Sequence, residues 1–204
     1  MCLKKFELAI AGMTISLFAT LPSLADSASE TVLDGPVNRT GHYYSLDLRS
    51  GPIKGHGSQI AGAQWGSIYN DLFSVGLALN GLTSHVDAPS IYGKGDLSFY
   101  YYGIQSEYEA YNWSIFSVNA GAFAGLGHPG YRSPDTSSGN RGKYVDATVK
   151  VLECSAIATM NLSPRAKAGL GLVYRHVTNP RLKGLSGSSL SGTDFLLTLR
   201  SGTF

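Results

Sequence analysis

The chain has 204 residues, enough for one domain with a substantial core, and only 15% of them are charged, against roughly 25% in an ordinary soluble domain. A formal net charge of +2 excludes the broad basic surface of a nucleic-acid-binding protein. Gly (25) and Tyr (12) are abundant and favour β-strands, because Gly weakens helices and Tyr suits a pleated surface.

The N-terminus has the pattern of a cleaved signal peptide. Two lysines precede an apolar run at residues 8–21, and Ser23 and Ala25 are the small residues at −3 and −1 of a cleavage site. The run is shorter than the ~20 residues that a membrane-spanning helix needs. The sequence thus predicts three parts: a signal peptide (1–25), a flexible leader (26–40) and one β-barrel domain (41–204).

After the leader, apolar and polar residues alternate with a period of two, which is typical of β-strands. In the last such segment, Phe195, Leu197 and Leu199 share one face. The pattern predicts eight strands, over residues 41–49, 59–69, 72–82, 95–108, 112–126, 143–156, 165–177 and 193–204. Most of them reach the ~9–11 residues that cross a bilayer when tilted.

The connections between these strands alternate in length. Tight turns are predicted at Asn70–Asp71, Ala110–Tyr111 and 159–164, and four longer, polar or Gly-rich loops begin at Ser50, Thr83, Gly127 and Thr178. Short turns at one end and long loops at the other are typical of outer-membrane barrels, which close because lipid offers the backbone no hydrogen-bond partners. The predicted fold is therefore all-β, an eight-stranded antiparallel up-and-down barrel of outer-membrane type, with both termini on the short-turn side.

The interior of an eight-stranded barrel is nearly filled by side chains. The alternation places six charged residues on the lumen side: Asp146, Lys150, Lys167, Arg175, Asp194 and Arg200. Because buried charges need partners, we expect an ionic plug and not an open pore; solvation at the rims is the alternative for each residue. Tyr and Trp residues gather near strand ends, as at a bilayer interface, or else pack in the core of a soluble barrel: Trp65, Tyr69, Tyr100, Tyr101, Tyr102, Tyr108, Tyr111 and Trp113.

The C-terminal residue is Phe204, and outer-membrane barrels commonly end in Phe. Counting back by twos from Phe204 gives a poor apolar stripe, since Phe195, Leu197 and Leu199 lie on the other face. A β-bulge near Ser201–Gly202 would return Phe204 to the lipid side.

Several stretches resemble an uncharacterised family of small Gram-negative envelope proteins. They are "LSFYYYGIQSEYEAY", "GAFAGLGHPGYR", "VLE", "MNLSPRAKAGLGLVYRHVTN", "GLSGSSLSG" and "RSGTF", between about Gly51 and Phe204. The resemblance implies an exported, outer-membrane-like β-barrel and brings no activity with it. His176 and Thr178 stand where that family tends to have an aromatic or apolar residue and a small one, so the position does not look catalytic.

A second resemblance is to the lipid A deacylases, eight-stranded barrels with a His-x-Ser-Asn motif on the next-to-last strand and an acidic partner on the last. In "RHVTN", His176, Thr178 and Asn179 follow that spacing, and Asp194 opens the last predicted strand. The resemblance implies an esterase in which a carboxylate orients an imidazole that activates a hydroxyl. However, Thr replaces the nucleophilic Ser, and His176 shares its face with apolar residues.

The remaining reactive residues do not form a recognisable site. Cys154 is the only cysteine once the signal peptide has left. The five histidines lie in separate segments without metal-ligand spacing: His42, His56, His85, His128 and His176. We therefore expect no metal and no cofactor.

The sequence predicts an outer-membrane barrel with a structural or interaction role through its four long loops. The expected partners are membrane lipid and a molecule of the envelope or the cell exterior, with no nucleic acid, and the expected state is a monomer. Two alternatives stay open. One is the deacylase-like esterase built on His176, Thr178 and Asp194; the other is a periplasmic, lipocalin-like barrel with a ligand in its lumen.

Overall fold

The computed structural model describes residues 40–204 except 88–95, 133–144, 179, 181 and 183, and it describes residues 132, 145 and 146 by their backbone alone. The predicted signal peptide and nearly all of the leader lie outside the described residues. The strands are β1 (Thr40–Ile53), β2 (His56–Tyr69), β3 (Phe73–Leu82), β4 (Asp96–Trp113), β5 (Phe116–Arg132), β6 (Val145–Asp146), β7 (Val149–Ser163), β8 (Ala166–Val177) and β9 (Gly192–Gly202). A helical turn, α2 (Gly187–Leu190), precedes β9. Among the described residues, no helix is long and apolar enough to cross a membrane.

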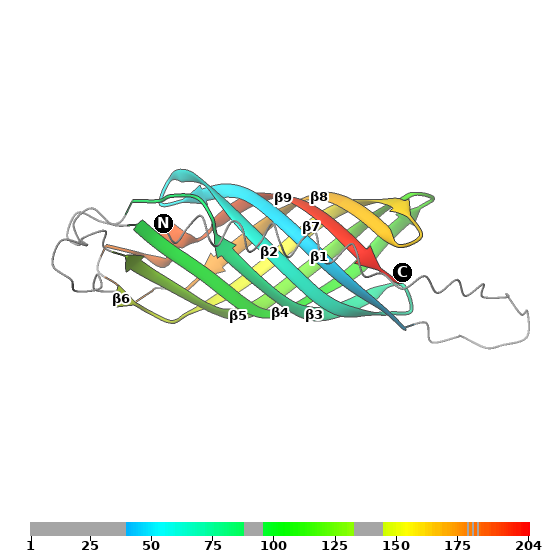
Figure 1. The fold of residues 1–204 in the computed structure, drawn as a ribbon, viewed down its shortest axis with the longest axis horizontal. Helices are drawn as coiled ribbons and strands as arrows, with labels where there is room; N and C mark the ends of the chain where they lie inside the picture. Colours follow the sequence, from blue (N-terminus) through cyan, green and yellow to red (C-terminus); the bar gives the residue numbers. More distant parts are fainter. Residues whose placement is uncertain (1–39, 88–95, 133–144, 179, 181, 183) are drawn as a thin grey trace, which may run out of the picture. The chain divides into compact units, whose positions relative to one another are not determined.

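The strands form one antiparallel sheet that closes on itself (Figure 1). Neighbours in the chain pair with one another, and β1 pairs with β9 from Tyr43–Gly202 to Ser50–Phe195, which joins the first strand to the last. β6 and β7 both pair with β5 and act as one interrupted strand, so the nine segments make an eight-stranded barrel. The predicted fold is confirmed.

Tight turns with positive φ join strands at both ends of the barrel. Asn70 (φ 53°) and Asp71 (φ 56°) form the predicted tight turn, with the left-handed conformation that suits the twist of a hairpin. Lys54 (φ 53°) and Gly55 (φ 76°) form a second such turn between β1 and β2. The long loop predicted to begin at Ser50 is therefore wrong, because both strands continue through it to a two-residue hairpin.

The turn between β4 and β5 also differs from the prediction. It lies at Ser114–Ile115 and not at Ala110–Tyr111, where the structure has a register shift between Glu109 and Tyr111. The bulge explains the error: a residue without a partner interrupts the period of two and imitates the end of a strand. β7 ends at Ser163 and β8 begins at Ala166, so the turn between them is Pro164–Arg165.

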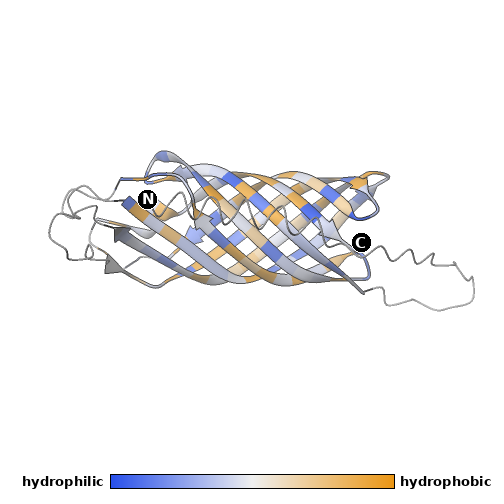
Figure 2. Ribbon diagram, in the orientation of Figure 1, coloured by the Kyte–Doolittle hydropathy of each residue, from blue (hydrophilic) through white to orange (hydrophobic). Residues whose placement is uncertain are grey.

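The alternation along each strand separates an apolar exterior from a mixed interior. Figure 2 shows hydrophobic and hydrophilic residues alternating along the strands. We call the end of the barrel with the long connections after β3, β5 and β8 the loop end, and the opposite end the turn end. The lumen at the loop end holds an apolar cluster that includes Val86, and the segment before β9 adds Leu182, Leu185 and Leu190 to it. Toward the turn end, the inward-facing side chains are mainly polar or charged: Ser45, Asp47, Gln64, Ser74, Gln105, Glu107, Ser117, Asn119, Thr159, Thr198 and Arg200.

Candidate functional site

The predicted esterase residues do not converge. His176 in β8 is exposed and points out of the barrel, whereas Asp194 in β9 is buried in the lumen. Thr178, just after β8, is exposed, and its hydroxyl accepts a hydrogen bond from the backbone N–H of Lys150 (2.9 Å). Asn179 lies outside the described residues. The sheet itself separates the imidazole from the carboxylate, so these residues cannot form the relay that the esterase needs.

Asp194 instead belongs to a buried ion pair. Its carboxylate accepts a hydrogen bond from Arg175 Nη1 (2.5 Å), and Arg175 Nε donates to the backbone carbonyl of Leu190 (2.8 Å). The two side chains are 1% and 0% exposed. Arg175 thus links the lumen wall to the segment that fills the loop end of the barrel.

A larger network crosses the middle of the lumen. Arg49 Nη1 donates to Glu153 (2.8 Å) and to the Tyr101 hydroxyl (3.1 Å), while Tyr101 donates to the other oxygen of Glu153 (2.7 Å). Asp47 lies 3.7 Å from Arg49 Nη2 and accepts a hydrogen bond from Thr198 (2.7 Å). Charges this deeply buried are tolerated because they are paired and hydrogen-bonded.

The predicted ionic interior is confirmed for three of its six residues, Arg175, Asp194 and Arg200. Lys167 lies at the turn end, 3.9 Å from a carboxylate oxygen of Glu109. The prediction was wrong for Lys150, which is exposed on the outside. The side chain of Asp146 lies outside the described part of the structure.

Lys150 faces outward because its neighbours Val149 and Val151 occupy the other face of β7. They point inward, into the apolar cluster at the loop end. Sequence reasoning also missed four charged lumen residues: Asp47, Arg49, Glu107 and Glu153. The signal was available in β1, where Tyr43, Ser45, Asp47 and Arg49 follow one another at a spacing of two.

At the turn end, the lumen opens into a cavity of about 380 Å³. Arg200 and Glu107 form two hydrogen bonds (2.6 and 2.7 Å) in its wall. Phe204 also lines the cavity, with its ring 4.5 Å from Lys167 Nζ. β9 keeps its register with both neighbours through Ser201, so the bulge that would return Phe204 to the lipid side is not found.

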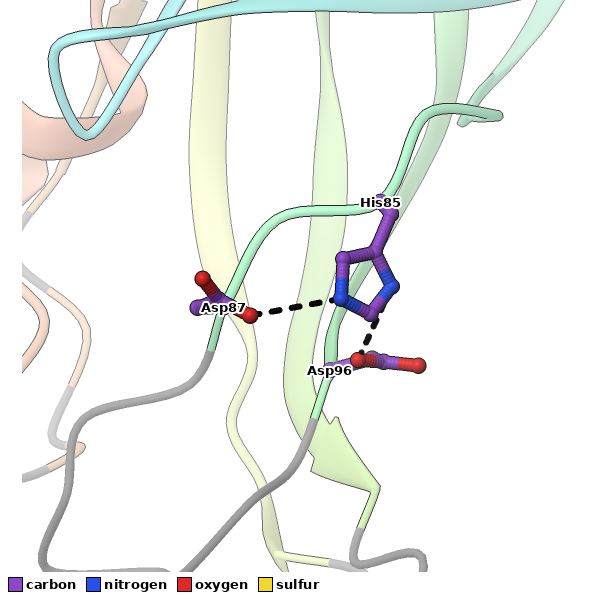
Figure 3. Close-up of side chains that lie close together, drawn as sticks. All are labelled: His85, Asp87 and Asp96. Carbon is purple, nitrogen blue, oxygen red and sulfur yellow. Dashed lines mark hydrogen bonds and ion pairs between the residues drawn. The ribbon is translucent and has the colours of Figure 1, made fainter.

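A cluster that the sequence did not reveal lies at the base of the β3–β4 connection (Figure 3). His85 Nε2 lies 3.2 Å from Asp87 Oδ1, and His85 Nδ1 lies 3.0 Å from Asp96 Oδ1. All three residues are exposed, and the backbone of Asp87 pairs with that of Asp96. Because both ring nitrogens of His85 face carboxylates, we interpret the cluster as a surface interaction that holds the two ends of the β3–β4 connection together.

No protein-family model matches this sequence, and no curated protein matches it. Solved structures do match the barrel. Neisserial surface protein A (NspA) has a TM-score of 0.57 at 12% identity, covering 79% of this chain and 96% of that chain. A major outer membrane protein from Thermus thermophilus has a TM-score of 0.50 at 11% identity, covering 79% and 99%. Ail, the attachment invasion locus protein of Yersinia pestis, has a TM-score of 0.48 at 10% identity, covering 81% and 98%. The first two likenesses establish the fold: this chain forms a β-barrel of the outer-membrane type.

Proposed function

We propose that this chain is an integral outer-membrane protein with a structural or interaction role. The observation that carries the proposal is the exterior of the barrel, where large apolar side chains stand exposed on neighbouring strands. Members of this belt include Leu48, Leu77, Leu79, Ile104, Leu152, Leu170, Leu172, Leu197 and Leu199, each 40–66% exposed. Soluble monomers rarely expose so large a continuous apolar surface. A periplasmic, lipocalin-like barrel would leave this surface in water, so the belt favours the membrane.

The aromatic residues support the same conclusion. Exposed Tyr and Trp side chains flank the belt on the turn side (Trp65, Tyr69, Tyr108, Tyr111 and Trp113) and on the loop side (Tyr100, Tyr102 and Tyr174). Such girdles suit the two membrane interfaces, because their rings are apolar and their N–H or O–H groups are polar. Two girdles on either side of an apolar band are difficult to explain as core packing.

The interior favours interaction over transport. The buried network around Arg49 and the apolar cluster above it fill the lumen, which leaves the loop end as the surface for a partner in the envelope or outside the cell. Long connections follow β3, β5 and β8, so three of the four predicted loops remain for this role. We propose that the barrel acts as a monomer.

Membrane fractionation combined with gel migration tests the proposal. We expect the protein in the outer-membrane fraction, extractable only with detergent, with an unheated band that migrates differently from the boiled one. A closed barrel that resists detergent unfolding gives this heat-modifiable migration. Recovery as a soluble monomer without detergent would contradict the proposal and favour the lipocalin-like alternative.

A further inference from the structure

Three basic side chains lie on the outside of neighbouring strands near the loop end: His128 in β5, Lys150 in β7 and His176 in β8. Lys150 and His176 are exposed, and His128 is half-buried. The next residues along the two strands, Val151 after Lys150 and Val177 after His176, are buried in the lumen. We call these three residues the basic row.

The register makes the basic row continuous. Lys150 pairs with Leu126 of β5, so His128 is its diagonal neighbour on one side. Leu152 pairs with His176, which is the diagonal neighbour of Lys150 on the other side. Diagonal neighbours on one face of a sheet lie about 7–8 Å apart, within reach of long side chains and of one shared ligand.

The basic row also stays near one level of the barrel. Each step along it moves one strand over and two residues toward the turn end. The strands of such barrels tilt by about 35–45°, so level positions on neighbouring strands are offset along the strand. The turns show an offset in the same direction. Asn161 of β7 donates its N–H to the carbonyl of Ile115, which already lies in the β4–β5 turn, and β7 continues beyond that level to Ser163.

The basic row has no acidic partner in the part of the chain that the structure describes. The carboxylates of Glu153 and Asp194, on the same or the adjoining strand, point into the lumen and bind Arg49 and Arg175. Lys150 makes hydrogen bonds through its backbone groups, and no side chain that the structure describes binds its ammonium. Within the described side chains, the positive charge of the basic row is thus available to an anion from outside the protein.

Aromatic and apolar groups beside the basic row indicate what carries that anion. His128 stacks on Tyr100 and Tyr102, with ring centroids 5.0 and 6.0 Å apart. On the turn side of the row, Leu152 and Tyr174 are exposed and belong to the apolar exterior. A molecule with an anionic head and an apolar chain would contact both surfaces at once.

We propose that the basic row binds the phosphate of an anionic lipid in the leaflet at the loop end of the barrel. This inference rests on the proposed membrane insertion, which brings the row to the level of the headgroups. An ammonium attracts the phosphate as a point charge, and each imidazole offers at least one N–H to its oxygens. Among outward-facing strand residues with described side chains, the other basic residue is His42, at the turn end of β1.

Native mass spectrometry of the full chain in detergent micelles tests this, with dioleoylphosphatidic acid as the probe and dioleoylglycerol, which lacks the phosphate, as its control. We expect the wild type to bind the phosphatidic acid more tightly than the diacylglycerol. Lys150→Gln should weaken that binding about fivefold and the triple change to Gln at His128, Lys150 and His176 at least about tenfold. His42→Gln, on the exterior at the opposite end, is the matched control and should leave it unchanged.

Heat-modifiable migration verifies that each variant folds, and Lys150→Gln decides the matter if the triple variant does not. Flotation of the wild type with phosphatidylcholine vesicles tests insertion separately. A wild type that floats, with the Lys150 variant as tight as wild type or the His42 variant equally weakened, would overturn the basic row alone. A wild type that fails to float would overturn the proposed function, and the inference with it.

Discussion

At the residue scale, the side chains that suggested catalysis turn out to have separate roles. Asp194 is buried against Arg175, whose other contact is the Leu190 carbonyl, so this carboxylate neutralises a cation inside the barrel. His176 is exposed on the opposite face. A spacing of residues along strands says nothing about a shared site unless the period of two puts them on the same side of the sheet.

The two residues should therefore respond differently to truncation. Asp194→Ala leaves Arg175 buried without its carboxylate and should lower the free energy of unfolding by about 3–5 kcal/mol. His176→Ala removes an exposed side chain and should change it by less than about 0.5 kcal/mol. Urea unfolding of both variants in lipid vesicles measures the difference. Equal losses would contradict the structural role assigned to the buried pair.

At the scale of the strands, the periodicity of the sequence is enough to predict the fold. Each strand of the barrel has an apolar face of three or more residues, so the alternation predicts all eight strands, and the alternating lengths of the connections indicate the barrel. Errors arose where the alternation was locally misleading. The bulge beside Ala110 resembled a turn, and the inward Val149 and Val151 resembled a lipid face because the loop end of the lumen is itself apolar.

The candidate site could not be predicted in the same way. The ion pairs join strands far apart in the chain, such as Arg49 with Glu153, separated by 104 residues. Alternation assigns a residue to a face, but a partner across the lumen depends on barrel register and tilt, which no local pattern contains. The basic row likewise depends on the register of β5, β7 and β8, which the sequence pattern does not give.

Whether the apolar exterior of the strands faces lipid can be tested by introducing an Arg at two different depths of the belt. Leu197 in β9 is 51% exposed and pairs with the outward Leu48 and Leu170 near the middle of the belt. Leu197→Arg should lower the free energy of unfolding from a bilayer by about 2–4 kcal/mol. Leu162→Arg, equally exposed at the turn end, should cost at most about 1 kcal/mol. Equal, small costs at both depths would indicate an exterior in water.

The close approach of β4 and β5 gives a second test at this scale. Gly103 pairs with Gly125, and a Cβ on Gly125 would clash with the backbone carbonyl of Tyr102. Gly125→Val should therefore lower the free energy of unfolding by about 1–3 kcal/mol, the usual cost of overpacking. Ala124→Val, on the exposed outer face one residue earlier, is the matched control and should have little effect. Similar losses from both would show that the inner face is not tightly packed there.

At the scale of the whole molecule, the lumen is blocked in successive layers. Leu182, Leu185 and Leu190 join the apolar cluster at the loop end. Below it lies the network of Arg49, Tyr101 and Glu153, and the open cavity begins only at the turn end. A solute entering from the turn end passes the cavity, whose wall mixes apolar residues such as Phe73 and Phe204 with the Arg200–Glu107 pair, and then meets the buried network before the apolar cluster.

Because the two layers act in series, removing one of them should not open a pore. We expect the wild type to give no large, stable current in a planar bilayer. Replacing residues 184–190 by a Gly/Ser linker removes leucines from the upper layer but leaves Arg49 bound to Glu153, so this variant should also fail to conduct. A general porin in the same bilayer provides the positive control. Steady currents from the wild type would contradict the filled lumen, whereas currents from the linker variant alone would show that the loop segment is the sole barrier.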